Sequence, residues 1–291
     1  MIILRTLMTI MIKIVLACLA IFAGIFAVKF LLFPAVYFIF NMQSGQLKVV
    51  EQFTTLMFIG LGYYLYVKYY EKRRPDELTF RASHLFYGAV SGAALISVTS
   101  LLLFYLGYYE VVSFQGLEGI PIVGSTILVA AMLEEFLFRG VLFRVIEAHV
   151  GTLFSLSFVA TLFGLLHLFN ENTTVVTAFS VTLLGVFWGG IYVLTRNIWV
   201  VGLNHAAWNF SIFSTGIPLS GNEDWRAVAP FESIYNGPLL LTGGEFGPED
   251  SIINIIVLLI SVVVIFYFAQ KNKAIVGFGE NTTSPKSEKE V

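Results

Sequence analysis

Five ionisable side chains of this sequence lie inside long apolar stretches, where charge is costly. They are Glu134, Glu135, Arg139, His167 and His205. A charge near the centre of a membrane helix costs about 2.5–3.5 kcal/mol on insertion scales, so such residues are expected to face the interior of a helix bundle and to satisfy one another. Carboxylates and imidazoles gathered in this way are groups that general acid–base catalysis uses.

The spacing of the first three residues separates two kinds of carboxylate. Glu135 and Arg139 stand four residues apart, so a helix places them on one face, where they can pair. Glu134 points about 100° away from its neighbour. One carboxylate can therefore stay ionised against the arginine, while the other is placed to act as a general base on a water molecule.

Polar groups form similar stripes on two other predicted helices. His205 and Asn209 stand four residues apart, as do Phe163 and His167. Each feature alone has a structural interpretation, because buried ion pairs, histidines and asparagines also hold membrane helices together. Packing does not require two carboxylates, two imidazoles and an amide on three helices, so we interpret the set as one functional site.

The elements that must position these residues are membrane helices by composition. Of the 291 residues, 57% are hydrophobic and only 12% are charged, with a mean hydropathy of +0.82, whereas a soluble domain has roughly 25% charged residues. A bilayer core about 30 Å thick takes about 20 apolar residues in a helix. The sequence therefore predicts an all-α fold, a polytopic membrane bundle of about eight transmembrane helices. The eight stretches run approximately over 12–40, 49–70, 84–109, 121–143, 151–170, 174–194, 198–216 and 251–270.

Composition also indicates the domain boundaries and excludes some classes of partner. Residues 1–271 form one predicted transmembrane domain in contact with membrane lipid, and 272–291 a polar, disordered cytoplasmic tail. The formal net charge of −2 offers no basic surface, so we expect no nucleic-acid partner. Cys18 is the only cysteine, which excludes an internal disulfide and a cysteine-based zinc cluster.

The distribution of charge orients the predicted bundle. Basic residues gather in connections on one side, which the positive-inside rule places in the cytoplasm. The opposite connections are acidic, above all the stretch 217–250, which we interpret as an interfacial loop with aromatic anchors. We therefore predict an integral protein of the plasma membrane with both termini in the cytoplasm. The basic residues are Lys72, Arg73, Arg74, Arg81, Arg139, Arg144, Arg196, Lys271 and Lys273, and the anchors are Trp225, Phe231, Tyr235 and Phe246.

Three short motifs resemble those of a known family. The sequence Glu-Glu-Phe-Leu-Phe-Arg at 134–139 resembles an E-E-x-x-x-R motif, Phe-Gly-Leu-Leu-His at 163–167 an F-x-x-x-H motif, and His-Ala-Ala-Trp-Asn at 205–209 an H-x-x-x-N motif. In this order, each on its own predicted span, they are similar to the CPBP family (CAAX proteases and bacteriocin-processing enzymes, also called Abi). The resemblance covers about 120–215, and no motif position departs from the family pattern.

The resemblance implies an intramembrane glutamate protease or metalloprotease that acts on a peptide or a membrane-associated protein. In the family, the first glutamate, here Glu134, activates the water that attacks the scissile carbonyl, and Arg139 supports the site. Eukaryotic members remove a C-terminal tripeptide from prenylated proteins, and other members are associated with bacteriocin self-immunity or scaffolding. The residues that the resemblance places around the same cavity are Glu135, His167, His205 and Asn209.

The residues themselves leave the role of a metal open. Glu134, His167 and His205 would meet the preference of zinc for three protein ligands and one open position, so a divalent ion such as zinc is one possibility. In the other, Glu134 is the base, and His205 and Asn209 donate hydrogen bonds to the developing oxyanion. The H-E-x-x-H helix of zinc proteases is absent. We favour hydrolysis centred on the glutamate.

Two other functions compete with hydrolysis. A non-catalytic membrane immunity or adaptor protein would use the polar cluster only to hold helices together. A proton-coupled transporter would use it as a relay, although no matching halves with interrupted helices are present. The depth of His167 is a further difficulty, because residue counting places it about 9 Å nearer the outer surface than Glu134 and His205. A common site therefore requires that its helix start later or tilt.

Overall fold

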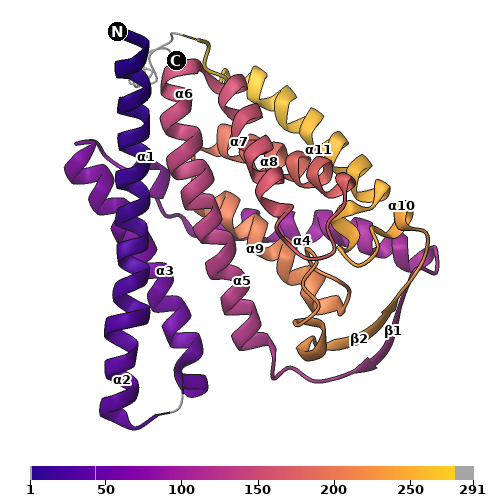
Figure 1. Cartoon of the computed structure of the whole chain (residues 1–291). Coiled ribbons are helices and arrows are strands. Elements are labelled where there is room, and N and C mark those ends of the chain that lie inside the picture. Colours follow the sequence, from indigo (N-terminus) through magenta and orange to yellow (C-terminus); the bar gives the residue numbers. More distant parts are fainter. Residues whose placement is uncertain (1, 43, 279–291) are drawn as a thin grey trace.

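The computed structural model describes residues 2–42 and 44–278, and most of the chain is helical. A helix occupies each of the eight predicted stretches (Figure 1). The helix of the first stretch is continuous from α1 (Ile2–Phe26) through a π-helical segment (Ala27–Leu32) into α2 (Phe33–Phe40). The helix of the fourth stretch is continuous from α5 (Ile120–Glu135) through a π-helical segment (Phe136–Phe143) into α6 (Arg144–Val150). The others are α3 (Lys48–Leu65) with its π-helical end (Tyr66–Tyr70), α4 (Ala82–Tyr105), α7 (Thr152–His167), α8 (Val175–Thr195), α9 (Ile198–Thr215) and α11 (Ile252–Lys271).

Five of the helices in the described chain are long and apolar enough to cross a membrane. They are Leu4–Phe40, Ala82–Tyr105, Ile120–Val150, Val175–Thr195 and Ile252–Lys271. Of the other three predicted spans, α7 is apolar but has only 16 residues. The count of eight spans therefore stays a prediction, whereas an integral membrane protein built of several apolar helices is confirmed.

Helix α8 lies at the centre of the helices that carry the polar residues. It packs against α7, α9 and α11, and 61% of its most apolar window is buried, against 11% for Leu4–Phe40 at the edge of the molecule. The edge helices expose large apolar side chains such as Phe38 and Val263. Such a surface is expected where lipid, rather than water, covers the protein.

Glycines allow the helices that carry the site to approach closely. A Cβ atom on Gly92 of α4 would lie 2.1 Å from the backbone oxygen of Asn204 in α9, and one on Gly164 of α7 would lie 2.2 Å from the hydroxyl of Thr182 in α8. Small residues serve this purpose in membrane bundles. The glycines therefore set how close α9 and α7 come to their neighbours.

An ionic network joins the connection after α3 to the fourth helix. Arg73 binds Glu77 (2.5 Å), Arg144 binds Glu71 (2.8 Å), and Tyr63 donates a hydrogen bond to Glu77. Burial alone would raise the pKa of both carboxyls, but the arginines outweigh it and hold the pKa of Glu71 and of Glu77 below the usual range. Charges that the sequence assigns to one side of the membrane thus lie together.

Two short strands form a sheet at the opposite end of the molecule from the described chain ends (Figure 1). β1 (Tyr109–Phe114) pairs antiparallel with β2 (Phe231–Tyr235). The expectation of a purely helical fold is wrong in this detail, because strands of five or six residues are too short to affect a count of span-length apolar stretches. The strands join the connection after α4 to the 217–250 stretch. That stretch also holds α10 (Leu239–Thr242) and short 3₁₀ turns at Arg226–Val228 and Pro248–Asp250.

The first part of the predicted tail is ordered. The backbone oxygen of Ala274 accepts a hydrogen bond from Arg196, and Val276 exchanges two hydrogen bonds with Thr152 at the start of α7. These contacts correct the expectation that disorder begins at residue 272. The remainder of the predicted tail, 279–291, lies outside the described residues.

Candidate active site

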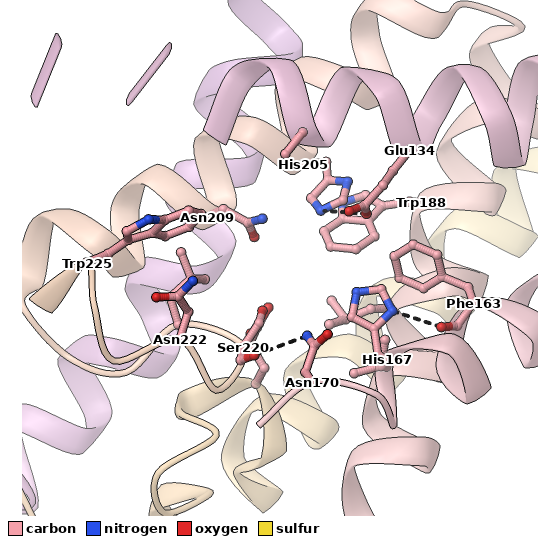
Figure 2. Close-up of a pocket in the computed structure, with 15 residues that line it drawn as sticks. Glu134, Phe163, His167, Asn170, Trp188, His205, Asn209, Ser220, Asn222 and Trp225 are labelled. Atoms are coloured by element: carbon pink, nitrogen blue, oxygen red, sulfur yellow. Dashed lines mark hydrogen bonds and ion pairs between the residues drawn. The ribbon is translucent and has the colours of Figure 1, made fainter. Parts of the chain in front are cut away.

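A cavity of about 160 Å³ brings the three sequence motifs together. Glu134 of α5, His167 of α7, and His205 and Asn209 of α9 all line it, and Figure 2 shows their side chains around the same space. Glu135 and Arg139 lie behind this wall, where they are 0% and 1% exposed. The structure thus gathers all six predicted residues at one site, four at the cavity surface and two behind it.

The buried pair holds one histidine in place. Arg139 donates to Oε1 of Glu135 (2.9 Å) and to the backbone oxygen of Gly185 in α8 (2.9 Å), so the predicted pairing four residues apart is present. The same Oε1 accepts a hydrogen bond from Nδ1 of His205 (3.0 Å). A histidine bound through Nδ1 keeps a fixed ring orientation. Nε2 of His205 is therefore the ring nitrogen that can act in the cavity.

Trp188 of α8 also fixes this ring, and its role was not predicted. The Trp188 and His205 rings stack with centroids 3.7 Å apart. The Trp188 indole donates to Oδ1 of Asn204 (3.0 Å), and the Asn204 amide donates to Ser91 of α4 (2.9 Å). Tryptophan and asparagine within apolar stretches give no indication of such a chain of contacts, because it forms only between separate helices.

Glu134 leaves the helix on a different side from Glu135, as the spacing predicts. Its Oε2 lies 3.9 Å from Nε2 of His205, and its side chain is one third exposed (Figure 2). The π-helical segment starts directly after Glu135, at Phe136. π-Helical insertions are frequent at functional sites, and here the insertion follows the carboxylate pair.

His167 is the last residue of α7, which starts at Thr152 and therefore does not start later than predicted. Its Nδ1 donates to the backbone oxygen of Phe163 (2.8 Å), so Nε2 is the nitrogen available to the cavity. The guanidinium carbon of Arg139 lies over the Phe163 ring, 5.3 Å from the ring centroid. The cavity lies at the end of α7, beside residues of the 217–250 stretch. His167 therefore reaches the same cavity as Glu134 and His205.

Buried polar atoms without a partner concentrate here. In the described part of the chain, five buried side-chain atoms have no hydrogen-bond partner. Two of them, Oε2 of Glu134 and Oδ1 of Asn209, belong to residues that line the cavity, and a third, Oε2 of Glu135, lies behind its wall. Because buried polar atoms are normally paired, this concentration indicates a place prepared for another molecule.

The 217–250 stretch completes the cavity. Ser220, Asn222, Trp225 and Glu249 line it together with Asn170, which donates to the backbone oxygen of Ser220 (3.2 Å; Figure 2). The interpretation of this stretch as an interfacial loop missed that role. The one indication in the sequence was a pair of acidic residues, Glu249 and Asp250, directly before the last apolar helix.

The fit of the residues to a metal can be tested directly. Among residues 2–42 and 44–278, no three His, Cys, Asp or Glu side chains lie close enough together to hold a metal ion. Nδ1 of His205 and Nδ1 of His167 are already bound within the protein. The assignment of Glu134, His167 and His205 as metal ligands stays a prediction to which this geometry adds no support.

Residues 116–211 match the family model described as type II CAAX prenyl endopeptidase Rce1-like. The resemblance to the CPBP family is confirmed. This CPBP segment contains all three motifs and ends before Ser220 and Glu249, so part of the cavity wall lies outside it. No curated protein and no solved structure matches the chain. A CPBP segment of this type implies a peptide hydrolase, in general terms a CAAX-type intramembrane endopeptidase with a peptide or protein substrate.

Proposed function

We propose that the protein hydrolyses peptide bonds of membrane-associated peptides or proteins, with Glu134 activating the attacking water. The observation that carries the proposal is the unpaired Oε2 of Glu134, 3.9 Å from Nε2 of His205, in a cavity that Asn209 also lines. A base, a second ring nitrogen and an amide around one space are the groups that amide hydrolysis needs.

In the first step, a water molecule bound to Oε2 of Glu134 loses a proton to that carboxylate and attacks the scissile carbonyl carbon. Nε2 of His205 is close enough to Oε2 to help hold the same water. Protein groups within hydrogen-bond reach of the water fix its direction of attack. Oε2 of Glu134 is buried and has no hydrogen-bond partner in the described part of the chain, so a water molecule in the cavity is a suitable partner for it.

As the new C–O bond forms, the carbonyl oxygen becomes an oxyanion that His205 and Asn209 stabilise. When both ring nitrogens of His205 carry a proton, Nδ1 donates to Glu135 and Nε2 donates to the oxyanion, while the Glu135 carboxylate compensates the positive charge. Asn209 donates from its amide. Each donor of this kind is worth about 2.7–4 kcal/mol of transition-state stabilisation. Arg139 pairs with Glu135 and holds it in position.

We place the protein in the plasma membrane with both chain termini in the cytoplasm. The described ends of the chain lie at the same end of the molecule, and the acidic 217–250 stretch lies toward the opposite end (Figure 1). The ionic network around Arg73 and Arg144 belongs to basic connections that the positive-inside rule assigns to the cytoplasm.

A non-catalytic immunity or adaptor function is the second candidate. The polar contacts behind the cavity wall join one helix to another or stiffen one. They run from Arg139 to Glu135 and to Gly185, and from His205 to Glu135. A protein that used the cluster only for stability would show these contacts too. It would have no need for the unpaired atoms of Glu134 and Asn209.

The test is a cleavage assay with purified protein in detergent and with prenylated and unprenylated membrane-associated peptides. We expect Glu134→Gln to abolish turnover without changing the melting temperature, because the substitution keeps the shape of the side chain and removes the base. Glu118→Gln, the same change at an exposed position, is the control. Normal cleavage by Glu134→Gln would refute the assignment. Chelator-treated wild type distinguishes the mechanisms, since zinc-restored activity would favour a metal.

A further inference from the structure

One carboxyl group at the cavity is not used by the mechanism above. Glu249 lies in the 3₁₀ turn Pro248–Asp250, is 2% exposed, and lines the cavity with Glu134 and His205. It is far from the three motifs in sequence and lies outside the CPBP segment. Its presence at the cavity follows only from the packing of the 217–250 stretch.

Hydrogen bonds hold Glu249 at the wall of the cavity. Its Oε2 accepts a hydrogen bond from Ser220 (2.5 Å), and its backbone oxygen accepts one from Asn254 (3.2 Å). The adjacent Asp250 is directed elsewhere, because it binds Thr177 and Ser180 of α8. Among the ion pairs of the described chain, none includes Glu249.

The charged and titratable groups around Glu249 come from four elements. Asp250 adjoins it on the same turn, His205 faces it from α9, and Glu134 of α5 and His167 of α7 line the same cavity. Burial is the largest influence and raises the pKa of Glu249, and the charge of Asp250 raises it further. Ser220, His205 and Trp208 lower it, and the result is a pKa of about 7. Both protonation states are therefore populated at neutral pH.

Amide hydrolysis needs two proton transfers. Water must lose a proton as its oxygen attacks, and the departing nitrogen must gain one, because an amide anion is too basic to leave. Glu134 serves the first transfer in the proposed function. A second carboxyl that holds a proton at neutral pH, at the same cavity, is a suitable donor for the other.

We propose that Glu249 is a second catalytic carboxyl, which donates its proton to the departing amine nitrogen. This inference rests on the proposed function. The C–O bond forms as Glu134 takes a proton from water, and the C–N bond then breaks as the nitrogen takes the proton of Glu249. The products are a carboxylic acid and an amine. The proton on Glu134 returns to Glu249 through solvent when the products leave, which restores both carboxyls.

A structural role for Glu249 makes different predictions. The hydrogen bond from Ser220 to Glu249 joins two parts of the 217–250 stretch that line the cavity. Glu249 could therefore serve only to stabilise this part of the cavity wall. In that case its loss would impair every substrate equally. A proton donor matters only where the leaving group needs a proton.

The decisive experiment compares an amide substrate with an ester of the same acyl part that releases nitrophenolate. We expect Glu249→Gln to lower kcat on the amide about 100-fold, the lower end of typical general-acid contributions, and to leave the ester rate nearly unchanged. Glu245→Gln, a matched change at an exposed site in the same stretch, should alter neither rate. An equal loss on both substrates would overturn the proposal.

The pH dependence of kcat/KM gives a second, independent measurement. For wild type we expect the amide rate, relative to the ester rate at the same pH, to fall above about pH 7 as Glu249 loses its proton, and this amide-specific alkaline limb should vanish in Glu249→Gln. The hydrogen bond from Ser220 stabilises the charged form, so Ser220→Ala should move the limb to higher pH. An unmoved limb in both variants would contradict the proposal.

The outcomes also separate this proposal from the proposed function. A wild-type protein that hydrolyses neither substrate overturns both. Turnover that Glu134→Gln abolishes, but that Glu249→Gln retains in full on the amide, overturns only the role of Glu249.

Discussion

At the scale of single residues, one carboxylate oxygen organises the site. Oε1 of Glu135 accepts from both Arg139 and His205, so the ion pair that stabilises the bundle also orients the histidine. Oε2 of Glu134, one residue earlier, has no hydrogen-bond partner in the described part of the chain, lies 3.9 Å from Nε2 of His205, and belongs to a side chain that lines the cavity. Two adjacent residues of one type therefore have different roles because the helix directs them to different surroundings.

The Glu135–Arg139 pair gives a prediction on stability. Glu135→Ala leaves a buried arginine without its partner charge, and breaking such a pair typically costs about 3–5 kcal/mol. We expect a large fall in melting temperature in detergent. The double variant Glu135→Ala with Arg139→Met should recover part of that fall, because no unpaired charge remains. A double variant less stable than Glu135→Ala would show that Arg139 contributes chiefly through Gly185.

At the scale of elements, the contact between α4 and α9 sets the position of His205. Gly92 of α4 lies against the backbone oxygen of Asn204, the residue directly before His205. The Asn204 side chain also binds Trp188, which stacks on the same histidine. A shift of α9 relative to α4 would therefore change the site as well as the packing.

A single added methyl group tests this contact. Gly92→Ala would place Cβ 2.1 Å from a backbone oxygen, and overpacking of this kind typically costs about 1–3 kcal/mol. We expect a lower melting temperature and a lower kcat. Gly60→Ala is the control, because its Cβ would meet only the Phe136 ring at 3.8 Å. Equal stability and activity in the two variants would contradict a close α4–α9 contact.

At the scale of the whole molecule, the ionic network around Glu71 and Glu77 couples stability to pH. The pKa of each carboxyl lies below its usual range, so the stabilisation is present above the unfolded pKa of about 4.3 and is lost as pH falls through the lower folded value. We expect a nearly constant contribution from pH 7 to pH 5 and a fall in melting temperature below about pH 4. Arg73→Met should reduce that dependence; an unchanged pH profile would refute the coupling.

The sequence by itself was enough for the local features. Hydropathy located the five helices long and apolar enough to cross a membrane, because about twenty consecutive apolar residues make a membrane-length helix. The three motifs contain Glu134, His167, His205 and Asn209, which line one cavity. Four-residue spacing places His205 and Asn209 on one helix face. The pairing of Glu135 with Arg139 followed from the same geometry.

Only the tertiary structure decided which distant residues share the cavity. Trp188, Ser220 and Glu249 lie there because helix packing and the fold of the 217–250 stretch bring them there, and no local periodicity encodes such contacts. The strand pair β1–β2 likewise depends on two segments more than a hundred residues apart. The local sequence determines whether a segment forms an apolar helix. Close packing between segments determines which side chains surround each reactive group.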